Sequence, residues 1–269
     1  MIRVCDVNFT YMTGTPFEKT ALKNISFDVS EGEVLAIAGH TGSGKSTLIQ
    51  IVAGLIDLQR GTVEIDNLPV TDKKIRRLVG IVFQYPEHQL FEETVAKDIA
   101  FAPKNFGLSD DEISARVDEA MRQVGLDSSL KNVSPFELSG GQRRRAAIAG
   151  ILAMKPKYLI LDEPTAGLDP KAKENLLHEI FGAVKKSGVT IILVSHNMDD
   201  IARFADRVIV LAQAEKIFDG KPRELFAREE ILTRAGLEPP PITQLMKTLG
   251  VNEIVLSLDE AEKLLLKKN

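Results

Sequence analysis

Cysteine is almost absent from this 269-residue chain, which has only Cys5. One thiol cannot form a disulfide within the chain, so no disulfide framework is expected. The N-terminus also lacks the charged and apolar pattern of a secretory signal peptide. Together these two absences predict a protein that works in the reducing environment of the cytoplasm.

The chain also lacks an excess of basic over acidic residues. The 34 Lys and Arg residues are outnumbered by 38 Asp and Glu residues, which gives a formal net charge of −4 at pH 7. A domain that binds nucleic acid through its phosphate backbone usually carries a basic excess on one face. We therefore expect no nucleic acid partner for this chain.

Long apolar runs are also lacking. The stretch 146–154 is among the longest, and it falls well short of the ~18 apolar residues that suggest a membrane-spanning helix. Any association with a membrane is therefore expected to depend on another protein. Hydrophobic residues nevertheless make up 44% of the chain, which is ordinary for a protein that builds a packed core.

Short apolar runs of different kinds predict an α/β fold. Residues 2–9 and 24–29 alternate roughly between apolar and polar, as strands of a half-solvated antiparallel layer do. Residues 34–38, 158–161 and 190–194 are largely apolar, which is typical of strands buried on both faces of a mainly parallel sheet. The chain is thus predicted to open with an antiparallel β layer and to continue into a mainly parallel core.

A mostly helical insert is predicted at about residues 85–150. Within it, the sequence from Ser109 has the pattern of a capping box, and apolar residues follow at helical spacing. Beyond the last core strand the parallel-sheet pattern stops, and a final amphipathic helix is expected after Ser257. We therefore divide the chain into a catalytic domain at 1–225 and a small C-terminal appendage at 226–269.

Residues 39–46 read GHTGSGKS and fit the phosphate-loop pattern G-x-x-x-x-G-K-[ST]. They follow a predicted buried strand and precede an apolar run at 47–52, which is the context that the motif requires. The glycines let backbone N–H groups wrap the phosphates, Lys45 can neutralise the β and γ groups, and Ser46 can bind Mg²⁺. The motif predicts a P-loop NTPase core.

Two consecutive carboxylates, Asp162 and Glu163, stand at the end of a predicted core strand. Successive residues at a strand end point in different directions, so Asp162 can face a metal ion while Glu163 reaches a water beyond it. We interpret the pair as a metal ligand and a general base. His196 follows the next core strand, which favours a catalytic role over a structural one. Gln84 also follows an apolar strand, and it either contacts Mg²⁺ or water or is an ordinary surface glutamine.

A second candidate anion site lies at Leu138-Ser139-Gly140-Gly141-Gln142. A serine, two glycines and a glutamine at the head of an apolar run are typical of a helix N-terminus that receives an anion. The phosphate loop, the carboxylates and the histidine already account for one nucleotide. We therefore expect the anion at this second site to belong to another subunit. The arginines at 143–145 are interpreted as a solvated helix face with some dimer contact.

The order of these motifs resembles the nucleotide-binding subunit of ATP-binding cassette (ABC) proteins, over roughly residues 1–225. In that family two subunits face each other head to tail. Each ATP lies between the phosphate loop of one subunit and the signature, here 139–142, of the other. The resemblance therefore implies ATP as substrate, Mg²⁺ as cofactor and a second ATPase subunit as partner.

The resemblance also implies a role for each matching residue. Tyr11 either stacks on adenine or is an ordinary strand aromatic. The residues implied to take part in catalysis are Lys45, Gln84, Glu163 and His196. Those implied to bind Mg²⁺ are Ser46, Gln84 and Asp162. Those implied to contact the nucleotide are Tyr11, Gly39, His40, Thr41, Gly42, Ser43, Gly44, Lys45, Ser46, Thr47, Ser139, Gly140, Gly141, Gln142 and Asp169.

A narrower resemblance rests on the stretch 82–91, VFQYPEHQLF, which is similar to the ATPases of energy-coupling factor (ECF) transporters. These transporters import vitamins and transition metals. The stretches 134–137 and 196–200 resemble the second of the two paralogous ATPases in those systems. The sequence departs from that subfamily at Ala102, where Gly is common, and at Ala146, where Val is common. Neither change removes a chemical group.

Importers of this kind combine two ATPases with a transmembrane scaffold protein and a small membrane protein that captures the substrate. The resemblance implies that residues 85–91 and the start of the helical insert form the groove for the scaffold, although these residues can also serve to pack the insert against the core. It also implies that 226–269 is a dimerisation region. It places the chain on the cytoplasmic face of the cell membrane as a peripheral protein. The alternatives are the ATPase of a conventional importer, a soluble ABC ATPase that acts on DNA or ribosomes, and a small-molecule P-loop kinase.

Overall fold

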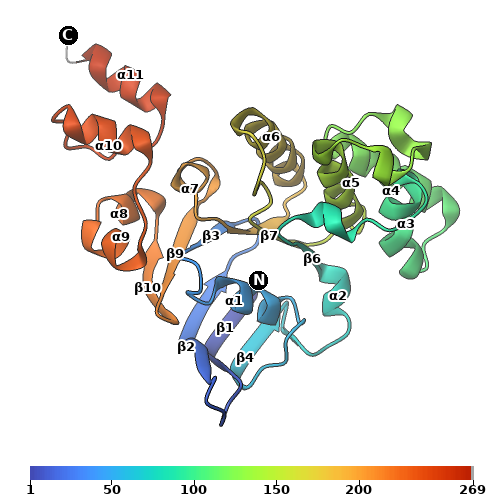
Figure 1. Ribbon diagram of the computed structural model, residues 1–269, viewed down its shortest axis with the longest axis horizontal. Coiled ribbons are helices and arrows are strands. Elements are labelled where there is room, and N and C mark those ends of the chain that lie inside the picture. The colour runs from blue at the N-terminus through green and yellow to red at the C-terminus, as the bar shows by residue number, and fades with distance from the viewer. Residues whose placement is uncertain (268–269) are drawn as a thin grey trace. The chain divides into compact units, whose positions relative to one another are not determined.

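Two long antiparallel strands open the chain, β1 at Ile2–Tyr11 and β2 at Lys19–Val29. The computed structural model describes residues 1–267, and in it these strands join β4 (Arg60–Ile65) and β5 (Leu68–Pro69) in a sheet of order β2-β1-β4-β5. Buried residues recur along β1 because successive side chains of a strand point to opposite faces. The predicted N-terminal antiparallel layer is confirmed (Figure 1).

The chain divides into two units. The first consists of Met1–Ile75 and the chain from Ile191 onward, and the second of Arg76–Thr190. The second unit is wider than the helical insert predicted at about 85–150, because it also contains the strands that precede and follow those helices.

The first unit contains the central parallel strands. β3 (Val34–Ala38) pairs in parallel with β8 (Thr190–Val194) and with β9 (Arg207–Ala212), while β10 (Glu215–Gly220) lies antiparallel to β9. Every residue of β3 and of β8 is buried, which explains why their sequences are largely apolar.

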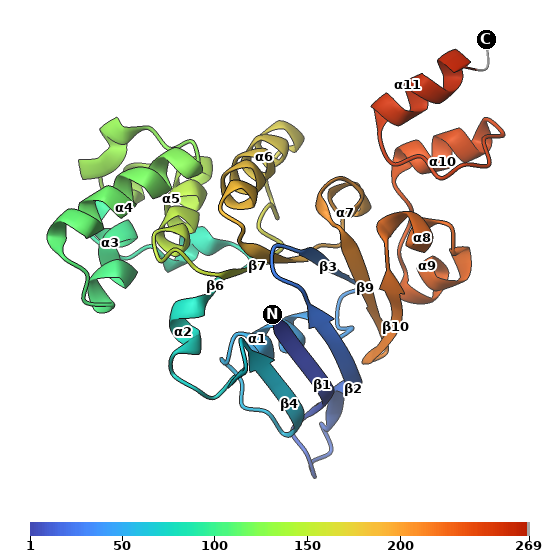
Figure 2. The ribbon, with the colours of Figure 1, turned by 180° about the vertical axis from the view of Figure 1, so that it is seen from behind.

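The second unit combines two parallel strands, β6 (Val79–Val82) and β7 (Tyr158–Asp162), with a group of helices. The helices are α2 (Ile75–Leu78), α3 (Val95–Asn105), α4 (Asp110–Gln123), α5 (Gly140–Leu152) and α6 (Pro170–Lys186), with 3-10 helices η1 (Pro86–Gln89), η2 (Ser128–Asn132) and η3 (Pro135–Glu137). Figures 1 and 2 show α3, α4 and α5 gathered together. The predicted α/β class and helical insert are confirmed. No helix within residues 1–267 has both the length and the apolar content to cross a membrane.

Helix α4 begins where the sequence predicts it. The Ser109 Oγ accepts a hydrogen bond from the Glu112 N–H, and the Glu112 carboxylate accepts one from the Ser109 N–H at 3.1 Å. This capping box satisfies two N–H groups that a helix start would otherwise leave without partners. At α11 (Leu258–Lys267) the Glu260 N–H donates to the Ser257 Oγ at 3.2 Å. Both predicted helix starts are confirmed.

The C-terminal chain packs in two parts. Side chains of α8 (Pro222–Phe226) and α9 (Glu229–Ala235) belong to the same buried cluster as those of β3 and β9. Helices α10 (Pro241–Thr248) and α11 share a smaller cluster built on Met246, Val251, Val255 and Ala261. In the proposed appendage at 226–269, the chain from Pro241 onward thus forms its own buried cluster, whose described members include no residue of the sheet.

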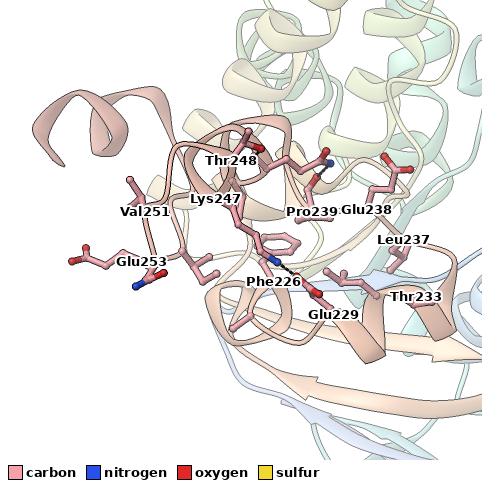
Figure 3. Close-up of a pocket in the computed structure, with 16 residues that line it drawn as sticks. Phe226, Glu229, Thr233, Leu237, Glu238, Pro239, Lys247, Thr248, Val251 and Glu253 are labelled. Atoms are coloured by element: carbon pink, nitrogen blue, oxygen red, sulfur yellow. Dashed lines mark hydrogen bonds and ion pairs between the residues drawn. The ribbon is translucent and has the colours of Figure 1, made fainter. Parts of the chain in front are cut away.

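A cavity of about 590 Å³ lies against α9 and α10. Figure 3 shows Phe226, Leu237 and Val251 in its apolar lining. Lys247 of α10 forms an ion pair with Glu229 of α9 beside the cavity. Both partners are largely exposed, so water screens their attraction and the pair contributes little to stability.

Candidate nucleotide-binding site

The loop from Gly39 to Gly44 joins β3 to helix α1 (Lys45–Val52). Gly39 and Gly44 have φ angles of +147° and +107°, which residues with side chains rarely adopt. A Cβ on Gly39 would collide with the carbonyl oxygen of Leu211, and one on Gly44 with that of Ala21. These two glycines are therefore required both for the conformation of the loop and for its close approach to neighbouring backbone.

The N-terminus of α1 has the features of a phosphate site. Its N-cap, Gly44, provides no side-chain hydrogen bond to the first N–H groups of the helix. The buried Lys45 ammonium donates to the carbonyl oxygens of Gly39 at 2.8 Å and His40 at 3.0 Å. The buried Ser43 hydroxyl has no hydrogen-bond partner among the described residues. Uncapped N–H groups, an ammonium and an unpaired hydroxyl together suit a bound phosphate.

Tyr11 and Lys19 lie opposite each other on β1 and β2, next to the phosphate loop. The Tyr11 hydroxyl is hydrogen-bonded to the Thr47 hydroxyl at 3.0 Å, and Tyr11 is 40% exposed. The Lys19 Nζ lies 4.0 Å from the position that a Cβ on Gly42 would take. The sequence does not predict Lys19 as a site residue, because a lone lysine on a strand carries no local signal. Only the pairing of β1 with β2 places its ammonium there.

Asp162 and Glu163 lie at the end of β7 in the second unit. Asp162 is 9% exposed, and Glu163 has a φ of +47°, a left-handed conformation that is strained for a residue with a side chain. The Gln84 Nε2 donates to the Glu163 Oε2 at 3.4 Å. Because β6 and β7 are parallel neighbours, the residues that follow them lie at the same edge of the sheet. The structure thus brings two predicted site residues into contact.

His196 is exposed and stands just beyond β8. The Ser195 hydroxyl accepts from the Asn197 N–H at 3.0 Å and donates to the Asp200 carboxylate at 3.4 Å. The Asn197 side chain accepts from two backbone N–H groups and so caps α7 (Met198–Phe204). These bonds fix the backbone on both sides of His196.

Helix α5 begins at the predicted signature. The Ser139 Oγ accepts from the Gln142 N–H at 3.3 Å, and the Gln142 side-chain oxygen accepts from the Ser139 N–H at 3.0 Å. Gly140 and Gly141 are exposed, and a Cβ on either would meet no atom of the described chain within 4 Å. The start of the helix is therefore held in shape by its own side chains and is open to an approaching anion.

The other predicted nucleotide contacts are accessible. His40, Thr41 and Ser46 are exposed members of the phosphate loop and the start of α1. Asp169 is exposed too, and its carboxylate accepts from the N–H groups of Lys171 at 3.1 Å and Ala172 at 3.0 Å. Asp169 thus caps the start of α6.

The arginines after the signature do not form the solvated face predicted from the sequence. Arg144 is only 3% exposed and binds two other segments of the unit. Arg145 donates to the carbonyl oxygen of Val124 and pairs with Glu179, and burial lowers its pKa. That prediction was wrong because this face of α5 is covered by segments distant in the sequence, of which the local pattern gives no sign.

A family model described as ABC transporter matches residues 22–166. That range covers more than half of the chain and contains the phosphate loop, the start of α5 and both carboxylates. The chain belongs to the ABC transporter family. Its enzymatic class is therefore that of the ABC ATPases, as the order of the motifs predicts.

Two curated relatives are similar to this ABC ATPase over nearly its whole length. The energy-coupling factor transporter ATP-binding protein EcfA2 of Clostridium perfringens is 50% identical over 98% of this chain and 97% of its own. EcfA2 of Caldanaerobacter subterraneus is 52% identical over 99% of this chain and 96% of its own. The predicted resemblance to ECF ATPases is confirmed.

Solved structures agree with this assignment. The structure of cbiO1 from Clostridium perfringens, part of the ABC transporter complex cbiONQ, has a TM-score of 0.77 and 40% identity over 91% of this chain and 98% of its own. The dimeric ATP-binding cassette MJ0796 bound to ADP and Pi has a TM-score of 0.73 and 34% identity over 83% of this chain and 99% of its own. The predicted P-loop ATPase fold is confirmed.

Proposed function

We propose that this ABC ATPase binds and hydrolyses ATP to drive uptake of a vitamin or a transition metal, as the ATPase subunit of an ECF-type importer. The observation that carries the proposal is the similarity to ECF ATP-binding proteins over nearly the full chain, at 50% identity. The phosphate loop, the two carboxylates and the signature are all present in the sequence. The protein is proposed to work at the cytoplasmic face of the cell membrane, bound to a membrane scaffold.

The first unit is proposed to bind ATP through the phosphate loop. The backbone N–H groups and the Lys45 ammonium would hold the triphosphate, with Thr47 at the end of the loop. Tyr11 would stack on adenine, and its hydrogen bond to Thr47 supports this role because it anchors an exposed ring beside the loop. Lys19 would add a second positive charge near the phosphates.

Replacing Lys19 by Gln is expected to weaken ATP binding by about tenfold, because one charged contact with phosphate is lost. Adenosine, which has no phosphate, should bind the variant and the wild-type protein equally. Titration calorimetry measures both affinities. Lys23→Gln is the matched control, because Lys23 lies on the same strand but pairs with Glu215. An equal loss of affinity for ATP and adenosine would contradict the proposed contact.

Mg²⁺ is proposed to accompany ATP. The residues to which the family resemblance assigns it are Ser46, Gln84 and Asp162. Their hydroxyl, amide and carboxylate oxygens are the hard donors that Mg²⁺ prefers, and Ser46 and Gln84 are exposed. Mg²⁺ would neutralise charge that develops on the terminal phosphates.

Glu163 is proposed as the general base. Its carboxylate would accept a proton from the water that attacks the γ-phosphate. Gln84 donates to one oxygen of that carboxylate, so the amide orients the base while the other oxygen can face the water. Lys45 and His196 would contact the γ-phosphate and stabilise its charge during transfer.

A second ATPase subunit, either a copy of this chain or a paralogue, is proposed to complete each ATP site. Ser139, Gly140, Gly141 and Gln142 would contact the ATP bound by the partner, and Asp169 would lie at the same interface. The open surface over both glycines supports this arrangement, since a phosphate could approach their backbone without obstruction.

A transmembrane scaffold protein is proposed to contact residues 85–91, and a substrate-capture membrane protein would reach the ATPase only through the scaffold. Exposed aromatic residues support the contact with the scaffold. Tyr85 is 41% exposed and Phe91 is 57% exposed. The Phe91 ring packs edge-on against the ring of the exposed Phe101, with 4.9 Å between the ring centroids. Exposed aromatic rings that pack together, as those of Phe91 and Phe101 do, are typical of a protein interface.

Deletion of the gene from its source cells tests the transport function. We expect the deletion strain to lose uptake of at least one labelled vitamin or transition-metal ion, and a plasmid copy of the wild-type gene to restore it. A plasmid copy with Glu163→Gln should not restore uptake, although the protein is made at the same level. Unchanged uptake of every vitamin and metal tested would contradict the proposed function.

A further inference from the structure

The guanidinium of Arg144 contacts three residues of the second unit, Glu87, Ala166 and Tyr85. Its Nε and Nη2 donate to the two carboxylate oxygens of Glu87 at 2.9 and 2.6 Å. Its Nη1 donates to the carbonyl oxygen of Ala166 at 2.6 Å, and the guanidinium carbon lies 5.7 Å from the centre of the Tyr85 ring. Burial alone would raise the pKa of Glu87, but the hydrogen bonds and charge of Arg144 outweigh it and hold that pKa below its ordinary value. The Glu87 carboxylate is therefore ionised at neutral pH.

Together with two further hydrogen bonds, these contacts join the turn that carries Glu163 to the segment that carries Gln84. Gln84 donates to the Glu163 side chain at 3.4 Å, and the Ala166 N–H donates to the Glu163 carbonyl oxygen at 3.1 Å. The Ala166 carbonyl is bound by Arg144, which also binds Glu87, three residues beyond Gln84. The turn that carries Glu163 and the segment that carries Gln84 are thus joined at two points, once directly and once through Arg144.

Both joined segments contain strained backbone. Tyr85 has a φ of +55° and Glu163 a φ of +47°, conformations that residues with side chains keep only when the surrounding structure holds them. The segments are also close to each other, because a Cβ on Gly167 would lie 3.4 Å from the Tyr85 ring. Arg144 supplies strong hydrogen bonds to both segments at this place.

We infer that Arg144 is a positioning residue for ATP hydrolysis: by binding Glu87 and the Ala166 carbonyl together, it keeps the Glu163 carboxylate within reach of Gln84. This inference rests on the proposed function, in which Glu163 is the base. An arginine is needed because its planar fork can bind a carboxylate with two N–H groups and a carbonyl with a third, whereas a lysine is a single point of charge. Since Tyr85 and Glu87 belong to the segment proposed to contact the scaffold, movement of that segment would be transmitted to the Glu163 turn.

The test compares Arg144→Lys with wild-type protein in the assembled ATPase. Turnover, kcat, is expected to fall by about a hundredfold, because a base displaced by about an ångström is poorly aligned with its water. The KM for ATP and the affinity for ATP should stay unchanged, because the phosphate loop belongs to the other unit. Arg145→Lys is the matched control: Arg145 is the neighbouring residue and is also ion-paired, but its partner Glu179 lies on α6. Its kcat should stay close to the wild-type value.

A charge swap separates positioning from simple stabilisation of the fold. In Glu87→Arg with Arg144→Glu the ion pair can re-form, but a carboxylate at position 144 cannot donate to the Ala166 carbonyl. We expect the swap to recover the Tm relative to the single variants while kcat stays low. The inference is overturned if Arg144→Lys keeps wild-type kcat, if Arg145→Lys loses as much, or if the swap restores full turnover. Absence of ATP hydrolysis in the wild-type assembly would instead overturn the proposed function.

Discussion

Replacement of Glu163 by Gln is expected to slow ATP hydrolysis by about 10²–10⁴-fold, because an amide cannot take the proton of the attacking water. The substitution keeps the size of the side chain and its capacity to accept a hydrogen bond from Gln84. ATP binding should be retained, since the phosphate loop and Lys45 lie in the first unit and are untouched. Single-turnover kinetics with labelled ATP, together with a separate binding titration, measure the two effects independently.

Glu174→Gln is a suitable control for this experiment. Glu174 is a carboxylate of the same unit, but it lies on the surface of α6 with a side chain that is 54% exposed. The control should hydrolyse ATP at the wild-type rate. Normal turnover by Glu163→Gln would remove Glu163 from the role of base and leave the reaction without a proton acceptor at this position.

Ser139→Arg is expected to abolish turnover while ATP still binds, because a large cation would fill the open space over Gly140 and Gly141. Lys45→Ala should abolish turnover for a different reason, the loss of the charge that holds the phosphates. If the protein forms homodimers, a mixture of the two dead variants contains dimers with one intact composite site. Equal mixing should then restore about a quarter of wild-type activity, since half of the dimers are mixed and each has one good site of two.

The measurement is the ATPase rate of each variant alone and of mixtures at several ratios. Restored activity that peaks at equal amounts supports a site shared between two copies of this chain. If no mixture recovers activity, the homodimer is contradicted, and the partner is a different ATPase of the same family. Mixing each variant with that paralogue would then be the corresponding experiment.

Features that depend on short stretches of sequence were predictable. β3, the phosphate loop and α1 are contiguous, so an apolar run followed by glycines and Lys45 was sufficient to predict them. The capping boxes at Ser109 and Ser139 are similarly local, because each needs only residues three apart. The same reason explains why Asp162 was correctly expected at the end of a buried strand.

Features that depend on long-range packing were not predictable. Arg144 looks like part of a solvated arginine run, and only its contacts with Glu87 and Ala166 reveal a buried residue. Lys19 gains its place beside Gly42 through the pairing of two strands. Helix α10 has no clear signal in the sequence either. Its start at Pro241 is compatible with a helix only because proline needs no N–H partner in the first turn.

The most direct test of the transport assignment is to identify what the protein binds in its own membranes. Tagged Glu163→Gln protein would be purified with ATP from detergent-solubilised membranes of its source cells, and its partners identified by mass spectrometry. We predict recovery of a second ABC ATPase, a helical membrane scaffold and one or more small membrane proteins. Recovery of ribosomes, DNA-bound complexes or a conventional permease in their place would contradict the assignment as an ECF-type importer.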